Sequence, residues 1–205
     1  MKKLSIKVLA EISIFASIGF VLDVLAGLIP NPAFAEGGSI GIAMVAIFVV
    51  GYRRGVVPAL FTGLLIGLLS MSTGIYAIAD TWYKVFFQVG LDYWICYTVV
   101  GVGVLFFSLA KKSEGKKKIG YLTTGIFVGS FLKFLSHFLS GVIFFGSYTP
   151  EGTNVIWYSI YYNAGYMIPC FVLSLIVMII FSLKYEAEIL IPNDQAKLHA
   201  NVQTK

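Results

Sequence analysis

The sequence predicts an all-α membrane protein that crosses the bilayer six times and keeps both termini in the cytoplasm. Apolar residues make up 58% of the 205 residues and charged residues only 12%, a composition far from that of soluble domains. The apolar residues gather in six runs of a length suited to membrane helices. We expect these helices at residues 6–29, 39–52, 55–71, 84–110, 119–145 and 156–184.

Basic residues at the ends of these runs set the predicted orientation. With both termini inside, only Lys84 falls outside, and the cytoplasmic side receives Lys2, Lys3, Lys7, Arg53, Arg54, Lys111, Lys112, Lys116, Lys117, Lys118 and Lys184. Cytoplasmic loops of membrane proteins carry such an excess of Lys and Arg. A nucleic-acid partner is not expected, because its binding needs a solvated basic face. The expected surroundings are membrane lipid.

The first run could be mistaken for a secretory signal, because Lys2 and Lys3 precede it and Ala33-Phe34-Ala35 follows it. Its length of 24 residues exceeds the roughly 7–15 residues of a signal core. It also contains Glu11 and Asp23, which a signal core avoids. We therefore predict that the first run is a full membrane span.

The second run, 39–52, is too short to span a membrane as a helix. At 1.5 Å per residue it reaches only ~20 Å, against a hydrocarbon core of about 30 Å. Non-helical backbone survives at membrane depth only where protein buries it or where it lines a wet cavity. We expect the first outer loop, residues 30–38, to fold inward over a cavity.

The chain divides into a membrane domain, 1–184, and a polar tail, 185–205, which we expect to be loosely ordered in the cytoplasm. The tail lacks a sustained apolar period. The two cysteines, Cys96 and Cys170, lie inside apolar runs without metal-ligand spacing, which favours simple packing roles. No metal or other cofactor is expected.

Asp92, Lys133 and His137 lie inside the predicted spans. They need an explanation, because an ionised side chain in a bilayer costs about 2.5–3.5 kcal/mol on insertion scales. Lys84, Gln88 and Asp92 recur at a spacing of four, so these residues lie along one stripe of a helix. Lys133 and His137 are also four apart on the next helix. Asp92 and Lys133 could form an ion pair that only joins two helices. Alternatively, all of them could line a binding pocket.

The last run begins with hydrogen-bonding aromatic residues. Its first turns contain Tyr158, Tyr161, Tyr162 and Asn163, whose hydroxyl and amide groups both donate and accept hydrogen bonds. Such a cluster suits a flat heteroaromatic ligand, whereas Trp157 is more typical of a membrane-interface residue. Because all these residues map to the outer halves of neighbouring helices, we expect a pocket that opens outward.

Small residues form a stripe on the first helix at Ala10, Ser13 and Ser17. Such stripes let another helix approach closely. The stripe could pack against the protein's own helices or against a partner protein in the membrane.

Four segments carry a resemblance that extends over residues 9–184: LKFLSHFLSGVIFFGSYTPEGT (132–153), WYSIYYN (157–163), GGSIGIAMVAIFVVGYRRG (37–55) and VGLDYW (89–94). The chain resembles the ThiT (YuaJ) family of thiamine-specific S components of bacterial ECF importers. The resemblance implies a six-helix bundle in the plasma membrane that captures thiamine from outside. It also implies delivery with an ECF module of two ATPases and one transmembrane coupling protein. The family's coupling surface carries small residues where this chain has Ser13 and Ser17.

The resemblance also assigns site residues by matching position. Asp92 falls where the family places an acidic residue on the aminopyrimidine of thiamine, and Tyr158 and Asn163 fall where it hydrogen-bonds that ring. His137 matches a pocket histidine. Phe145 occupies a position where some members have a tryptophan that stacks on the ligand, and stacking on a cation is weaker for Phe than for Trp.

The remaining matches are less direct. Trp82, or its neighbour Tyr83, lies near the position of a pocket tyrosine. An acidic residue that some relatives place near the thiazolium maps to Gly41, so that contact is absent unless Glu36 replaces it.

Other functions remain open from the residues. The chain could be an S component for the pyrimidine precursor of thiamine, or a secondary transporter that couples to protons through Asp92 and Lys133. An intramembrane enzyme using His137 and Asp92 lacks a nucleophile motif. ATP hydrolysis is not expected, because the chain has no GxxxxGK[ST] phosphate loop.

Overall fold

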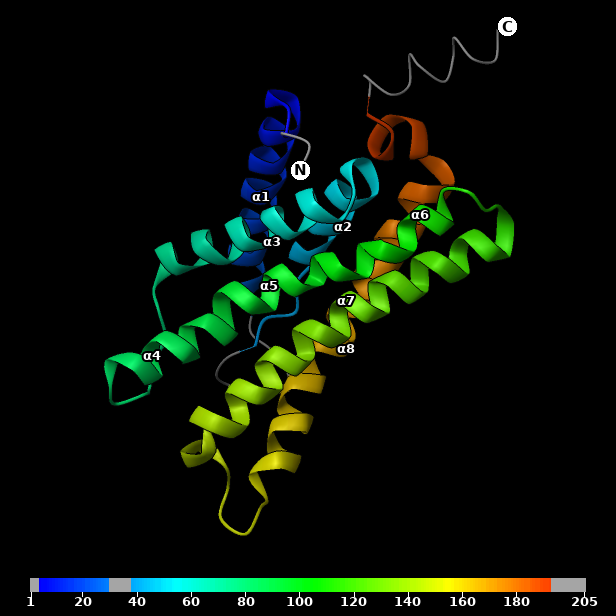
Figure 1. Ribbon diagram of the computed structural model, residues 1–205. Coiled ribbons are helices and arrows are strands. Elements are labelled where there is room, and N and C mark those ends of the chain that lie inside the picture. Colours follow the sequence, from blue (N-terminus) through cyan, green and yellow to red (C-terminus); the bar gives the residue numbers. More distant parts are fainter. Residues whose placement is uncertain (1–3, 30–37, 193–205) are drawn as a thin grey trace, which may run out of the picture.

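The computed structural model describes residues 4–29 and 38–192, and every regular element within them is helical (Figure 1). The α-helices within these two ranges are α1 (Ile6–Gly27), α2 (Ala43–Arg54), α3 (Val56–Ser70), α4 (Trp82–Val89), α5 (Cys96–Thr98), α6 (Phe107–Ala110), α7 (Gly115–Phe144) and α8 (Val155–Lys184). Among the described residues, five helical segments are long and apolar enough to cross a membrane. The predicted class, an all-helical protein of several membrane spans, is therefore confirmed.

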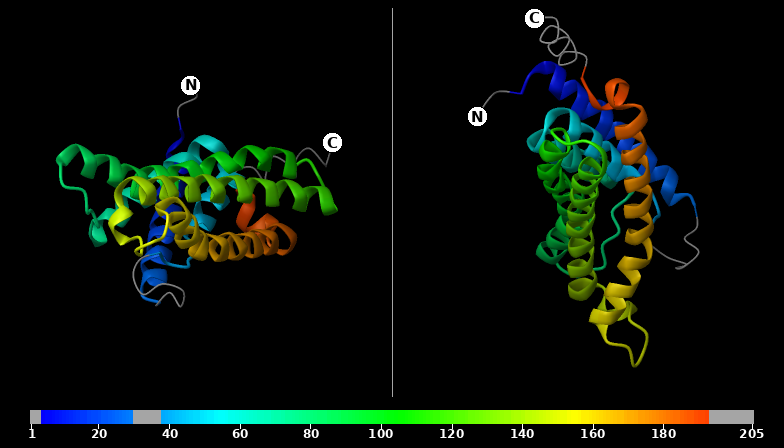
Figure 2. Two further views of the ribbon diagram at one scale, coloured as in Figure 1. Left: turned by 90° about the horizontal axis from the view of Figure 1, so that it is seen from below. Right: turned by 90° about the vertical axis from the view of Figure 1, so that its right-hand side faces the viewer.

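One of those segments, Trp82–Ala110, is a single helix of changing geometry. It joins α4, a π-helical turn (Gly90–Ile95), α5, a 3₁₀ stretch (Val99–Phe106) and α6 without a gap. We call Trp82–Ala110 the broken helix. It lies alongside α7, and α8 packs on α7 (Figures 1 and 2).

Helix α2 is the central element and is shorter than a membrane span. Its 12 residues include an unbroken buried stretch from Ala43 to Tyr52, and it contacts α1, α3, α8 and the broken helix. The backbone before it, 38–42, is not helical. The helix predicted at 39–52 therefore starts four residues later than expected, and irregular backbone takes the place of its first residues. Residues 30–37 of the expected inward-folding loop lie outside the described residues.

Glycines bring the broken helix close to its neighbours. A Cβ placed on Gly103 would lie 2.0 Å from the carbonyl oxygen of Gly125 in α7, and one on Gly67 of α3 would lie 2.1 Å from that of Tyr93. No side chain fits in such spaces. Close backbone contact through small residues is a common way to associate helices in lipid.

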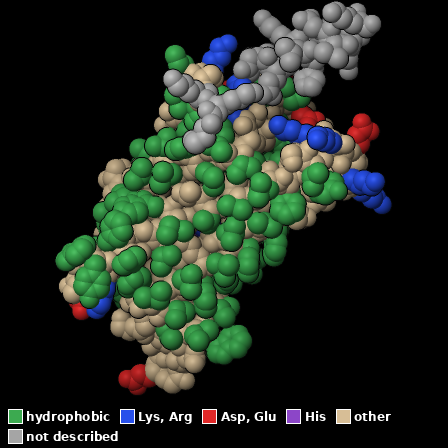
Figure 3. Space-filling view, viewed as in Figure 1, with side chains coloured by type: hydrophobic (Ala, Val, Ile, Leu, Met, Phe, Trp, Pro, Cys, Tyr) green, Lys and Arg blue, Asp and Glu red, His purple; other side chains and the backbone are tan. Residues whose placement is uncertain are grey.

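Ion pairs gather the two described ends of the chain at one end of the bundle. Glu11 of α1 binds Arg53 at 3.0 Å and Arg54 at 2.7 Å, and Arg53 also donates to the carbonyl of Ile189. Lys118 of α7 pairs with Glu186 at 2.6 Å. Figure 3 shows Lys and Arg side chains toward this end and hydrophobic side chains over the middle of the visible face.

The first residues beyond α8 are ordered by this network. Glu186–Leu190 forms a π-helical turn, the Tyr52 hydroxyl donates to Glu186, and Leu190 is only 1% exposed. This differs from the predicted loose tail, because Glu186 and Leu190 bring a charge and an apolar side chain that the bundle can bind. Residues 193–205 of that tail lie outside the described residues.

Candidate functional site

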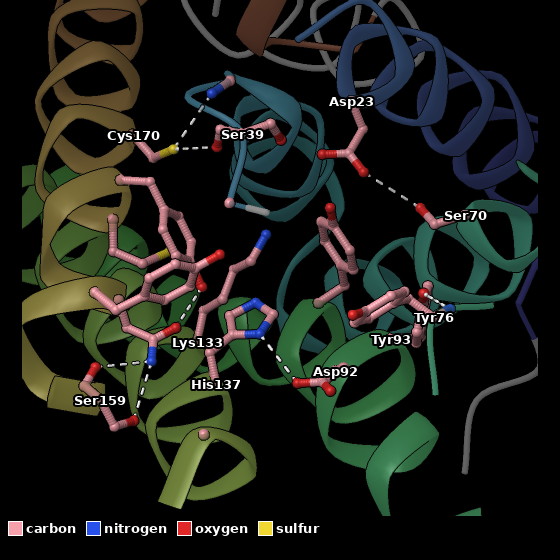
Figure 4. A pocket seen from close by; sticks show the side chains of 18 of the residues that line it. Asp23, Ser39, Ser70, Tyr76, Asp92, Tyr93, Lys133, His137, Ser159 and Cys170 are labelled. Atoms are coloured by element: carbon pink, nitrogen blue, oxygen red, sulfur yellow. Dashed lines mark hydrogen bonds and ion pairs between the residues drawn. The ribbon is translucent and has the colours of Figure 1, made fainter. Parts of the chain in front are cut away.

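A cavity of about 1010 Å³ lies between α1, α3, the broken helix, α7 and α8, with the irregular backbone before α2 forming part of its wall (Figure 4). Among the residues predicted for the site, Asp92, Lys133, His137, Phe145, Tyr158 and Asn163 line it. Five of these residues come from the broken helix, α7 and α8, and Phe145 directly follows α7. The cavity is large enough for a ligand of vitamin size.

Asp92 reaches the cavity from the π-helical turn of the broken helix. Its carboxylate accepts a hydrogen bond of 2.7 Å from the Ser140 hydroxyl and lies 3.5 Å from Nδ1 of His137. The same turn leaves the carbonyl of Leu91 to accept from the Ser136 hydroxyl at 2.7 Å. The wider π turn therefore docks on α7 through side-chain donors. Such turns inside α-helices are frequent at functional sites.

Lys133 lies over an aromatic face instead of pairing with Asp92. Its Nζ is 3.7 Å from the ring centroid of Tyr97, and the residue is only 8% exposed. Both Lys133 and Asp92 are among the described residues, and no ion pair joins them. The helix-joining ion pair considered from the sequence is not formed, so both charges remain on the cavity wall.

Asn163 is held in one orientation by its own helix. Its amide nitrogen donates to the Ser159 carbonyl at 2.9 Å, and its amide oxygen accepts from the Tyr166 hydroxyl at 2.6 Å. Pro169 follows in the same helix. Because proline has no N–H, it leaves a backbone acceptor free, which is tolerated in membrane helices that have neighbours.

Three rings form a cage at one end of the cavity. Tyr76 and Phe145 stack with centroids 6.2 Å apart and an angle of 18° between their planes, and Tyr148 lies 5.9 Å from Phe145. Gln88 fixes the loop that carries Tyr76, because its side-chain oxygen accepts from the amides of Ile78 and Ala79. The fully buried Gln88 is therefore a positioning residue for the cage.

The sequence profile of the family described as "Thiamine transporter protein (Thia_YuaJ)" matches residues 9–190. This chain belongs to the ThiT (YuaJ) family. The predicted family, thiamine-transporting S components of ECF importers, is confirmed. A family of transporters also removes the intramembrane enzyme from consideration, and the chain is a multi-pass protein of a bacterial membrane.

Individual relatives agree with the ThiT profile. The "Thiamine transporter ThiT" of Bacillus subtilis is 36% identical over 174 residues, which cover 83% of this chain and 87% of the relative. That of Lacticaseibacillus paracasei is 33% identical over 178 residues, covering 83% and 84%. A solved structure of ThiT from Listeria monocytogenes superposes with a TM-score of 0.77 at 25% identity, covering 90% of this chain and 97% of that one.

Some residues that the ThiT resemblance singled out lie away from the cavity. Trp82 and Tyr83 are not among its lining residues, and Trp82 is 82% exposed. The physical reason is that α4 begins at Trp82, so both rings stand on its first turn while the preceding loop turns Tyr76 inward. Glu36 lies outside the described residues.

Gly41 lines the cavity. At the position that matches Gly41, the resemblance to ThiT implies an acidic residue in some members of the family. A Cβ on Gly41 would lie 2.7 Å from the Cβ of Ala26 in α1. The close approach of α1 leaves no room for a side chain at this position, so glycine there follows from packing.

The small-residue stripe of α1 faces outward. Ala10, Ser13 and Ser17 are exposed, whereas Ile12 and Ala16 pack on the opposite face against the bundle. Of the two alternatives left open by the sequence, packing against the protein's own helices is therefore not observed among the described residues.

Sequence reasoning missed several lining residues: Asp23, Ser70, Tyr76, Tyr93, Tyr97, Tyr148 and Tyr166. Asp23 carried a usable signal, because it is a carboxylate inside an apolar run, as Asp92 is. Tyr76 and Tyr148 carried none, since rings beside the ends of membrane helices are also typical of interface belts.

Proposed function

We propose that this chain binds thiamine in the cavity from outside the cell and delivers it to the cytoplasm together with an ECF module of two ATPases and one transmembrane coupling protein. The observation that carries the proposal is the meeting, around one cavity, of an oriented carboxylate, an oriented amide and a ring cage. These groups match the two rings of thiamine.

The aminopyrimidine ring presents an amino donor and two ring-nitrogen acceptors. Asp92 is a suitable acceptor for the amino group, because Ser140 and His137 already hold its carboxylate in place. The hydroxyl of Tyr158 supplies a donor. The amide oxygen of Asn163, which accepts one hydrogen bond from Tyr166, can accept a second from the amino group. Since Asn163 is only 4% exposed and is fixed by Tyr166, little conformational entropy is lost when it binds a ligand.

The thiazolium ring carries a permanent positive charge, which aromatic faces attract. Phe145, Tyr76 and Tyr148 supply such faces at one end of the cavity. His137 lies with its ring 6.0 Å from that of Tyr166 and completes the aromatic wall between the two proposed ring positions.

The basic end of the bundle supports cytoplasmic termini. Arg53, Arg54 and Lys118 are joined there by Glu11 and Glu186, whereas Lys84 pairs with Asp80 at the other end of the broken helix. With Lys and Arg inside, the chain crosses the membrane six times, α2 and residues 38–42 making the second crossing together. The cavity then opens to the outside.

The first test is calorimetric titration of the purified protein with thiamine. None of the three tryptophans, all of them described, lines the cavity, so heat is a more direct signal than fluorescence. Asp92→Ala is expected to weaken binding at least about 30-fold and Asn163→Ala about tenfold. Asp80→Ala, which removes an exposed carboxylate outside the cavity, is the matched control. A folded wild-type protein that does not bind thiamine would refute the proposal.

A second test separates binding from delivery. The outward-facing stripe Ala10, Ser13 and Ser17 is proposed as the docking surface for the coupling protein. Ser17→Leu is expected to leave thiamine affinity unchanged and to abolish uptake into vesicles that contain the ECF module. Thr124→Leu, on an exposed face of α7, should affect neither. Normal uptake by Ser17→Leu would place the docking surface elsewhere.

A further inference from the structure

Asp23 is a carboxylate in the membrane domain that the contacts proposed above do not use. It belongs to α1, lines the cavity and is only partly exposed. The Ser70 hydroxyl lies 3.4 Å from its Oδ2. Within residues 4–29 and 38–192 it forms no ion pair. Figure 4 shows Asp23 entering the cavity from α1, apart from the group formed by Asp92 and His137.

The charges on the described cavity wall do not balance. Asp23 and Asp92 bring two carboxylates and Lys133 brings one ammonium group, which leaves one negative charge when His137 is neutral. Lys133 is held over the ring of Tyr97, and Asp92 is bound by Ser140 and His137. Neither carboxylate has a permanently charged partner on the described wall, but Asp92 is already engaged by two side chains of α7. Asp23, whose Oδ2 lies 3.4 Å from the Ser70 hydroxyl, is therefore the carboxylate that can face a cationic ligand.

An ionised group in a membrane is costly unless it has a partner. A ligand with one permanent positive charge would neutralise the wall, whereas an uncharged ligand of the same shape would leave Asp23 unpaired and partly desolvated. Electrostatic attraction acts over a longer range in such low-dielectric surroundings than in water. The cavity therefore discriminates by charge, in addition to the shape and hydrogen bonds of the pyrimidine end.

We propose that Asp23 is the counter-ion of the cationic ring of the substrate and makes the cavity select thiamine over uncharged pyrimidines. This inference rests on the proposed function and assigns to α1 a part in substrate choice. Because the pyrimidine precursor of thiamine has no thiazolium, Asp23 would attract thiamine electrostatically but would form no ionic contact with the precursor.

The test uses two ligands that differ only in charge: thiamine and its isostere in which a carbon replaces the thiazolium nitrogen, so that the ring is neutral. Both are titrated calorimetrically into the full-length protein and into Asp23→Asn, which keeps the side-chain shape. The wild type is expected to prefer thiamine at least about tenfold, and Asp23→Asn to lose about tenfold in thiamine affinity. Affinity for the neutral isostere should change less than about twofold, because no charge is lost opposite it.

Two further variants serve as a control and as a second test of Asp23. Asp80→Asn makes the same chemical change at an exposed loop position and should leave both affinities unchanged. If Asp23→Asn does not fold, Ser70→Ala removes the hydroxyl beside the carboxylate and should lower the affinity for thiamine more than that for the isostere.

The outcomes distinguish the two proposals. Thiamine binding with an unchanged thiamine-to-isostere ratio in the Asp23→Asn and Ser70→Ala variants would overturn the role of Asp23 and leave the proposed function standing. Equal losses for both ligands would also overturn it, because they would indicate a structural role. A wild type that binds neither ligand would overturn the proposed function and this inference together.

Discussion

The contact between the broken helix and α7 is built in opposite ways along its length. Toward the cavity, the two helices are not tightly packed. The broken helix has its π turn there, and the cavity is lined by Asp92, Lys133 and His137. Further along, Gly103 and Gly125 bring the two backbones into contact. The same helix pair thus combines a polar void with a close-packed seam. The shape of the cavity therefore depends on the rigid seam beside it.

The largest effect is expected from breaking the seam. Gly103→Ala places a Cβ 2.0 Å from a backbone oxygen that cannot move aside easily, which should cost about 3 kcal/mol through overpacking. The melting temperature in detergent should fall by roughly 10 °C. Gly120→Ala, also glycine to alanine but with nothing within 4 Å, is the control. Equal melting temperatures for the two variants would show that the seam is loose.

A smaller effect is expected when the cavity loses an orienting contact. Tyr166→Phe removes the hydroxyl that donates to Asn163 while keeping the ring. The freed amide should weaken thiamine binding about fivefold, in keeping with about 1 kcal/mol for a hydrogen bond, without a change in melting temperature comparable to that of Gly103→Ala. Calorimetry and thermal unfolding on the same sample check this separation. A loss of stability without a loss of affinity would contradict it.

A substitution in the ring cage is expected to raise the affinity for thiamine. Phe145→Trp enlarges the aromatic face stacked with Tyr76, and Trp attracts cations more strongly than Phe. Thiamine affinity should rise about threefold, while affinity for the neutral isostere should not follow it. Titration of both ligands measures the difference, and a parallel rise for both would point to added contact area and not to charge.

The smallest effect is expected at Trp82. Since its side chain is largely exposed and lies outside the cavity wall, Trp82→Ala should change thiamine affinity less than about twofold. Tyr76→Ala, which removes a ring of the cage, is the contrasting variant and should weaken binding clearly more. The reverse order would support the position inferred from the sequence for Trp82.

The sequence predicted the long helices well, because their apolar runs end at charges and turn formers. Helices α7 and α8 were expected at 119–145 and 156–184 and occupy Gly115–Phe144 and Val155–Lys184. Asp92, Lys133 and His137 were found because intramembrane charges are rare and therefore informative.

The rest depends on geometry that a regular period does not contain. The expected stripe of Lys84, Gln88 and Asp92 assumes an uninterrupted α-helix, but the π turn at Gly90–Ile95 changes the rotation per residue before Asp92 is reached. Gln88 binds the loop that carries Tyr76, Lys84 binds Asp80, and of the three only Asp92 reaches the cavity. Spacing alone could not indicate which member of the stripe would face the ligand.

The shortness of α2 has a consequence for how the chain enters the membrane during synthesis. A 12-residue helix ending in Arg53 and Arg54 spans only ~18 Å and offers lipid no complete apolar segment of its own. Glu11, which the ribosome produces earlier, forms ion pairs with both arginines and offsets one of their two positive charges. Helix α1 is thus positioned to receive α2, and α3 can follow directly through Gly55. Insertion of α2 is expected to be a cooperative event among the first three helices.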